Sequence, residues 1–177
     1  MPLPDAAKIL IVYFSRTGTT RKVAEALARA ANADLEELQE ARSRHGFWGY
    51  LRSGFEATSR RASSELLPLK HDPQRYDIVM IGSPTWSASL SSPVRAYLER
   101  ERANLPDTGL FVTCRGREAE AVLAQMSALL AKPPLAKLTL REVDVKWSPA
   151  AQVGEFLEKA LVAWEKPRAE RLADAAP

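Results

Sequence analysis

A short polar segment at residues 15–20, with the sequence SRTGTT, contains the side chains best suited to bind an anion. It lies between an apolar run at residues 8–14, typical of a strand buried on both faces, and a helical pattern at residues 20–31. A helix N-terminus presents unpaired N–H groups, hydroxyls add donors, and Gly18 lets the backbone curve around a ligand. The segment therefore predicts a phosphate site, with a helix start capped by Ser or Thr as the alternative.

Two further polar segments follow apolar runs. Residues 83–89, SPTWSAS, follow a run at 76–82, and Trp86 in this proline-stiffened loop could stack on a planar ring; a core tryptophan is the alternative. Cys114 and Arg115 follow a run at 110–113. A neighbouring arginine favours a reactive thiolate, but a single cysteine at a strand end is more often a small buried side chain, and we expect the latter.

The sequence excludes several other kinds of site. No lysine follows Gly18 at the spacing of the P-loop, and no GxGxxG fingerprint occurs. One cysteine and two histidines, His45 and His71, supply neither an internal disulfide nor a structural zinc set. We predict no metal site and assign no catalytic residue.

The order of the expected elements predicts the fold class and the place where the three polar segments meet. Strands are expected at residues 8–14, 34–38, 76–82, 110–113 and 135–145, and helices at 20–31, from 92, at 118–130 and from 148. This alternation predicts an α/β fold, a doubly wound five-stranded parallel sheet of order 2-1-3-4-5 with helices on both faces. In such sheets a ligand binds beyond the carboxyl ends of the strands, where the three polar segments would lie.

Length and charge predict one domain with a distinctive insertion. Of the 177 residues, 1–166 form the predicted domain, 41–61 a basic, aromatic insertion, and 167–177 a charged tail. The insertion holds five arginines and one glutamate, whereas the whole chain has a net charge of only +3. A uniformly basic nucleic-acid binder is therefore not expected. Trp48, Leu51 and Phe55 share one helical face, so the insertion predicts an amphipathic helix that completes the core; a lid or docking element for an acidic partner or an anionic membrane is the alternative.

No targeting or membrane-spanning segment is evident in the sequence. The longest apolar run, at residues 9–14, is far shorter than the ~20 residues that span a bilayer. The first residues have neither a basic region nor an apolar core of the kind found in signal peptides. We therefore expect a cytoplasmic protein without a transmembrane segment, for which peripheral membrane contact is left open.

Three stretches of the sequence resemble the flavodoxin family: KILIVYFSRTGTTRKVAEAL, YDIVMIGSPTWSASLSSPVRAYL and LFVTCRG. The resemblance extends over almost the whole chain and is weakest at residues 41–61. It implies FMN as the cofactor, with its 5′-phosphate bound by Ser15, Arg16, Thr17, Gly18, Thr19 and Thr20. It places Pro84, Thr85, Trp86, Ser87 and Ala88 beside the isoalloxazine ring, with Trp86 stacked on it. It places Thr113, Cys114, Arg115 and Gly116 near the pyrimidine edge.

Two departures from the family leave the function open. Carrier flavodoxins are typically acidic and commonly have a tyrosine in the third loop, whereas this chain is slightly basic and has residues 113–116, TCRG, at that place. One hypothesis is an electron carrier that docks with a redox partner protein. The other is an FMN-dependent reductase that passes hydride from NAD(P)H to a small quinone-like acceptor. Nucleic-acid binding through the insertion is a less favoured third.

Overall fold

The computed structural model describes residues 7–41 and 65–174, with side chains described as far as residue 166. The predicted insertion and its amphipathic helix therefore lie outside the described residues, apart from Ala41. No helix in the part of the chain that the structure describes is long and apolar enough to cross a membrane.

Five parallel strands form the centre of the fold, in the order β2-β1-β3-β5-β6. The strands are β1 (Ile9–Tyr13), β2 (Asp34–Glu37), β3 (Ile78–Trp86), β5 (Asp107–Cys114) and β6 (Ala136–Arg141). In chain order this is the predicted arrangement 2-1-3-4-5. A short sixth strand, β4 (Ser89–Leu90), pairs antiparallel with the end of β3. The predicted α/β class and sheet order are confirmed, with β4 as an addition.

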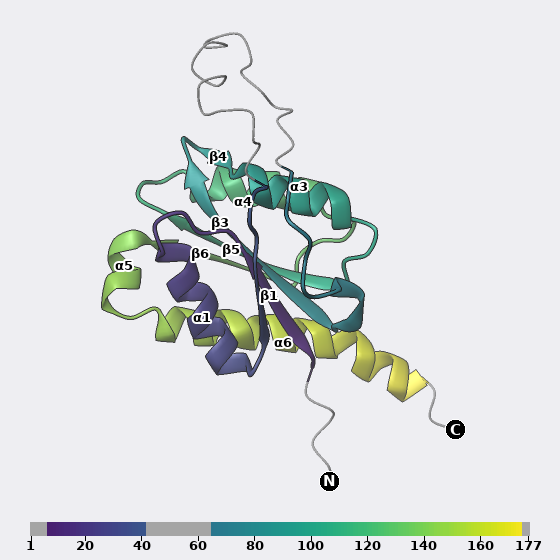
Figure 1. Cartoon of the computed structure of the whole chain (residues 1–177). Helices are drawn as coiled ribbons and strands as arrows, with labels where there is room; N and C mark the ends of the chain where they lie inside the picture. Colours follow the sequence, from purple (N-terminus) through teal and green to yellow (C-terminus); the bar gives the residue numbers. More distant parts are fainter. Residues whose placement is uncertain (1–6, 42–64, 175–177) are drawn as a thin grey trace.

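Helices cover both faces of the sheet (Figure 1). One face packs against α3 (Ser92–Glu101) and α4 (Ala119–Leu129), and the other against α1 (Thr19–Ala31) and α6 (Ala150–Asp174). Successive side chains of a strand point to opposite faces, so in β1 Leu10 and Val12 enter the first core while Ile9 and Ile11 enter the second. Because both faces of β1 are buried, all of its residues are apolar.

Two predicted elements differ in the structure. Residues 142–145, predicted as the end of a strand, belong to α5 (Glu142–Trp147), whose first turn carries acidic residues that suit a helix N-terminus. Residues 83–86, predicted as a loop, continue β3, because Ser83 and Pro84 pair with β5 and Thr85 and Trp86 pair with β4. In addition, α6 runs to Asp174 and so extends into the predicted tail.

Candidate functional site

A cavity of about 650 Å³ lies at the carboxyl ends of β1, β3 and β5, within the usual range for small-molecule and cofactor sites. The structure brings the three predicted segments together around it. The predicted residues that line it are Arg16, Thr17, Thr19, Thr20, Pro84, Thr85, Trp86, Ser87, Thr113, Cys114 and Arg115. Ser15, Gly18, Ala88 and Gly116 are not among its lining residues, whereas Glu142, which was not predicted, is.

The first segment is shaped by Ser15 and Gly18, although neither lines the cavity. The hydroxyl oxygen of Ser15 accepts hydrogen bonds from the backbone N–H groups of Gly18 and Arg21, at 3.1 and 3.2 Å. Gly18 lies at the N-cap of α1 with φ of 90°, a conformation that glycine adopts without strain. Ser15 thus occupies the N–H of Arg21 in the first turn of α1, while Gly18 has no side chain to cap the helix, so the N–H groups of Thr19 and Thr20 are left open toward a ligand.

Threonine hydroxyls connect this segment to the other sides of the cavity. The hydroxyls of Thr20 and Thr113, both buried, lie 2.8 Å apart and join the start of α1 to the end of β5. The hydroxyls of Thr17 and Thr19 lie 3.4 Å apart. Thr17 is exposed, so its hydroxyl is available to a ligand in the cavity.

Glu142 is the lining residue that the sequence analysis missed. Its carboxylate accepts a hydrogen bond from the Thr19 hydroxyl at 3.0 Å and one from Nε of Arg115 at 2.7 Å. The bond from Arg115, followed by that from Thr19, lowers the pKa of Glu142, which is therefore negatively charged at neutral pH. The only sequence signal was an acidic residue at the expected end of the last strand, because Glu142 lies 123 residues from Thr19 along the chain.

The second segment forms a β-hairpin that brings Trp86 to the cavity. The turn between β3 and β4 consists of Ser87 and Ala88, with φ of 48° and 60°. Two-residue hairpin turns of this kind favour Asn-Gly, so a Ser-Ala pair carries strain of about 1–2 kcal/mol per residue. The ring of Trp86 contacts that of Phe14 edge-on, with centroids 5.5 Å apart and an interplanar angle of 87°. Trp86 therefore lines the cavity rather than filling the core.

Gln125 of α4 anchors this hairpin from outside the predicted segments. Its amide nitrogen donates to the carbonyl oxygen of Ala88, and its amide oxygen accepts from the N–H of Leu90, both at 3.2 Å. The same oxygen accepts from the guanidinium of Arg95 at 3.2 Å. One side chain thus holds the strained turn at both ends, and we infer that it positions Trp86.

We expect Gln125→Ala to lower the free energy of unfolding by about 1–2 kcal/mol, because two partly exposed hydrogen bonds to the hairpin are lost. Gln125→Glu keeps an acceptor for Leu90 but sets a carboxylate oxygen against the Ala88 carbonyl in place of the donor, so it should also lower the free energy of unfolding. Urea denaturation measures both effects. Ser127→Ala on the same helix, where the hydroxyl donates to the Leu123 carbonyl of its own helix, is the control; if it lowers the free energy of unfolding as much, Gln125 does not act through the hairpin.

The third segment supplies a buried thiol and an exposed cation. Cys114 is buried, its thiol donates to the carbonyl of Gly116 at 3.3 Å, and burial raises its pKa. The structure therefore favours the buried side chain over the reactive thiolate. Arg115 is exposed and ion-paired with Glu142. Among the described residues, no group of three or more histidine, cysteine, aspartate or glutamate side chains is placed to hold a metal ion.

Comparison with known proteins agrees with this architecture. A family model described as "Flavodoxin" matches residues 8–104, more than half of the chain. No curated protein matches. A flavoprotein from Lactobacillus acidophilus, solved in complex with FMN, has a TM-score of 0.60 and 21% identity, covering 76% of this chain and 93% of its own. A flavodoxin, WrbA-like protein from Agrobacterium tumefaciens has a TM-score of 0.57 and 17% identity, covering 89% of this chain and 97% of its own.

Proposed function

This chain belongs to the flavodoxin family, and from that premise we propose that it binds FMN in the cavity and transfers electrons through the bound flavin. The observation that carries the proposal is the meeting, in one cavity, of the hydroxyl-rich start of α1 with the Trp86 hairpin. The first suits a phosphate and the second a flat aromatic ring. The solved flavoprotein from Lactobacillus acidophilus, which has the same fold, is a complex with FMN.

The start of α1 fits a phosphate group. A Cβ added at Gly18 would meet nothing within 4 Å, so this part of the loop is open. Thr17 and Thr19 can direct hydroxyls at the phosphate, the first turn of α1 can offer N–H groups, and the exposed Arg16 adds positive charge. Ser15 would act indirectly, by holding the loop in shape.

The hairpin and the third segment would hold the isoalloxazine ring. Trp86, kept in place by Phe14 and by the anchored turn, can stack on one face of the ring. Thr113, Cys114 and Arg115 line the cavity beside it. When bound, FMN supplies the one- and two-electron chemistry of its ring, while the protein orients it and tunes its potential.

One observation favours a reductase over a simple carrier. Among the described residues that line the cavity, Trp86 is the single aromatic side chain. A ring covered by an aromatic on one face only leaves the other face accessible to a hydride donor such as NAD(P)H. Stopped-flow mixing of FMN-loaded protein with NADPH under argon distinguishes the two: fast bleaching of the flavin absorbance supports a reductase, and no bleaching supports a carrier that needs a partner protein.

The test of the cofactor itself is direct. The purified protein should be yellow, or take up added FMN with quenching of flavin fluorescence, and acid should release a flavin with one phosphate. A colourless protein that does not bind added FMN would overturn the proposed function.

We expect Glu142→Gln to tighten FMN binding about threefold to tenfold. The carboxylate repels the phosphate and occupies the Thr19 hydroxyl, while partial exposure limits this repulsion to about 1 kcal/mol. Fluorescence titration measures the change, which riboflavin, lacking the phosphate, should not show. Glu158→Gln, an exposed position on α6, is the matched control, and weaker FMN binding in Glu142→Gln would contradict the expected repulsion.

A further inference from the structure

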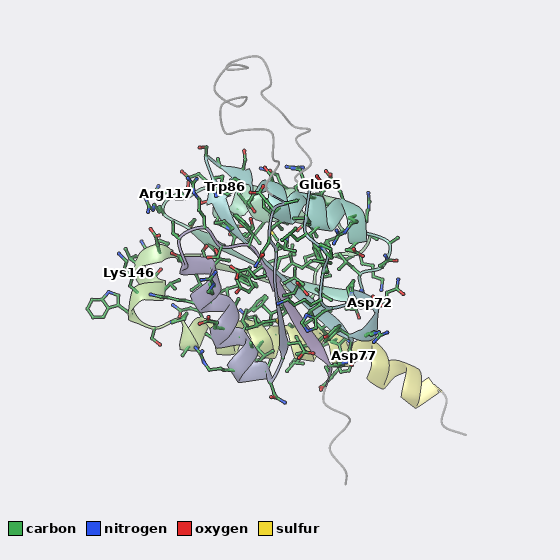
Figure 2. The ribbon with its side chains drawn as sticks, viewed as in Figure 1. Glu65, Asp72, Asp77, Trp86, Arg117 and Lys146 are labelled. Atoms are coloured by element: carbon green, nitrogen blue, oxygen red, sulfur yellow. The ribbon has the colours of Figure 1, made fainter. Side chains whose placement is uncertain are left out.

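Two completely buried serines close the base of the hairpin that carries Trp86. Ser83 lies in β3 before the hairpin begins, and Ser91 directly follows β4. Both residues are 0% exposed, and their hydroxyl oxygens lie 2.9 Å apart. Figure 2 shows Trp86 on this hairpin, at the end of the molecule where β3 and β4 leave the main sheet. The pair therefore joins the two strands at the point from which Trp86 projects.

The hydrogen bonds of this pair have a defined direction. A serine hydroxyl has a single proton, and the hydroxyl of Ser83 donates to the carbonyl oxygen of Pro84 at 2.8 Å. The hydroxyl of Ser83 must therefore accept from that of Ser91. The two bonds form a chain that runs from Ser91 through Ser83 to the Pro84 carbonyl, so both buried hydroxyl protons are used, as buried polar groups require.

This chain of hydroxyls ends at the peptide where β3 changes its partner strand. Residues of β3 up to Pro84 pair with β5, whereas Thr85 and Trp86 pair with β4. Trp86 is thus two residues beyond the carbonyl that Ser83 holds. Because the peptide unit is planar and rigid, a fixed Pro84 carbonyl also fixes the direction in which the next residues leave the sheet.

Ser91 does not have the usual role of a serine at its position. It is the N-cap residue of α3, where a serine hydroxyl normally accepts a hydrogen bond from an N–H of the first turn. Here its side chain makes no such bond, and Pro93, the second residue of the helix, has no N–H to offer. The hydroxyl is directed at Ser83 instead, so it serves the hairpin rather than the helix.

The same part of α3 also supports the tip of the hairpin. Arg95, one turn after Ser91, donates from its guanidinium to the amide oxygen of Gln125 at 3.2 Å. Gln125 in turn bonds both ends of the hairpin turn. The first turns of α3 thus hold the hairpin at its base through Ser83 and at its tip through Gln125.

We propose that Ser83 and Ser91 are positioning residues, which act through the Pro84 carbonyl to hold Trp86 in the orientation that stacks on the isoalloxazine ring. This inference rests on the proposed function, since the ring is the partner of Trp86 there. Neither serine lines the cavity, so their influence on a flavin passes through the hairpin. A pair that only stabilised the fold would leave the orientation of Trp86 unchanged.

Fluorine NMR follows Trp86 without any flavin. Labelling with 5-fluorotryptophan gives a resonance for each of the four tryptophans, and Trp86→Phe identifies the resonance of Trp86. In Ser83→Ala and in Ser91→Ala we expect this resonance to shift or to split, because the side chain takes up more than one orientation. Ser92→Ala, at the adjacent and only partly buried serine, is the matched control and should leave it unchanged.

Titration with FMN and with riboflavin tests the same step on the ring. Ser83→Ala and Ser91→Ala should weaken the binding of both ligands about threefold to tenfold, the range that the loss of one aromatic stack allows. The two ligands should respond alike, because the serines act on the ring side and not on the phosphate. In a Trp86→Ala background neither substitution should have a further effect on affinity, since a residue that acts through Trp86 then has nothing to position.

Several outcomes would overturn the positioning role. These are an unchanged Trp86 resonance in both serine variants, an equal change in Ser92→Ala, unchanged FMN affinity in a protein that binds FMN, or further losses of affinity in the Trp86→Ala background. Because the fluorine signal needs no flavin, a response of Trp86 to both serine variants would support their hold on this side chain even if FMN binding, and with it the proposed function, failed.

Discussion

Replacing Thr17 by alanine is expected to weaken FMN binding about tenfold to a hundredfold. Thr17 lines the cavity just before the first turn of α1, and its exposed hydroxyl can donate directly to the phosphate. A hydrogen bond to a charged group contributes roughly 1.5–3 kcal/mol, which corresponds to this loss. Titration of the protein with FMN, followed by the quenching of flavin fluorescence, measures the dissociation constant.

Two comparisons make the Thr17 result specific to the phosphate. Riboflavin should bind wild-type protein weakly and be nearly insensitive to the change. Thr139→Ala, an exposed threonine of β6 that does not line the cavity, should leave FMN affinity unchanged. An equal loss for FMN and riboflavin in Thr17→Ala would mean that the segment at residues 15–20 does not hold the phosphate.

Gly82→Ala is expected to destabilise the protein by about 3 kcal/mol or more. A Cβ at Gly82 would lie 2.1 Å from the ring of Phe111, its neighbour on β5. Phe111 is completely buried, so its ring has no free space into which it can turn. Overpacking of a dense core typically costs 1–3 kcal/mol and sometimes more, because neighbouring backbone must shift. Chemical denaturation measures the loss, and the midpoint should fall strongly.

A double-mutant cycle separates this collision from a general loss at Gly82. Phe111→Leu alone should also destabilise, since it removes part of a large buried side chain. In Gly82→Ala/Phe111→Leu the new methyl group occupies space that the ring has left, so the double variant should be clearly more stable than the sum of the two losses predicts. Additive losses would show that Phe111 does not determine the need for glycine at residue 82.

Local patterns in the sequence were sufficient to predict most strands of the sheet and the position of the first segment of the site. The apolar run of β1 reflects burial on both faces of the sheet, which any strand in this position requires. The hydroxyl and glycine pattern at residues 15–20 lies directly next to the start of the helix with which it forms the site. Eleven of the predicted residues line the cavity, because parallel strands bring their carboxyl ends to the same edge of the sheet.

The tertiary structure alone decided the features that depend on partners far away in the chain. Residues 83–86 look like a loop, with their serine and proline, and become strand through pairing with β5 in their first half and with β4 in their second, where Gln125 also holds the turn. Polar and apolar residues alternate at 142–145 as they do in a strand, yet these residues belong to α5. The first residue of that helix, Glu142, accepts hydrogen bonds from Thr19 and Arg115. The periodicity of apolar residues indicates which side chains within one helix or strand are buried. These contacts instead join side chains that are brought together only once the sheet has formed.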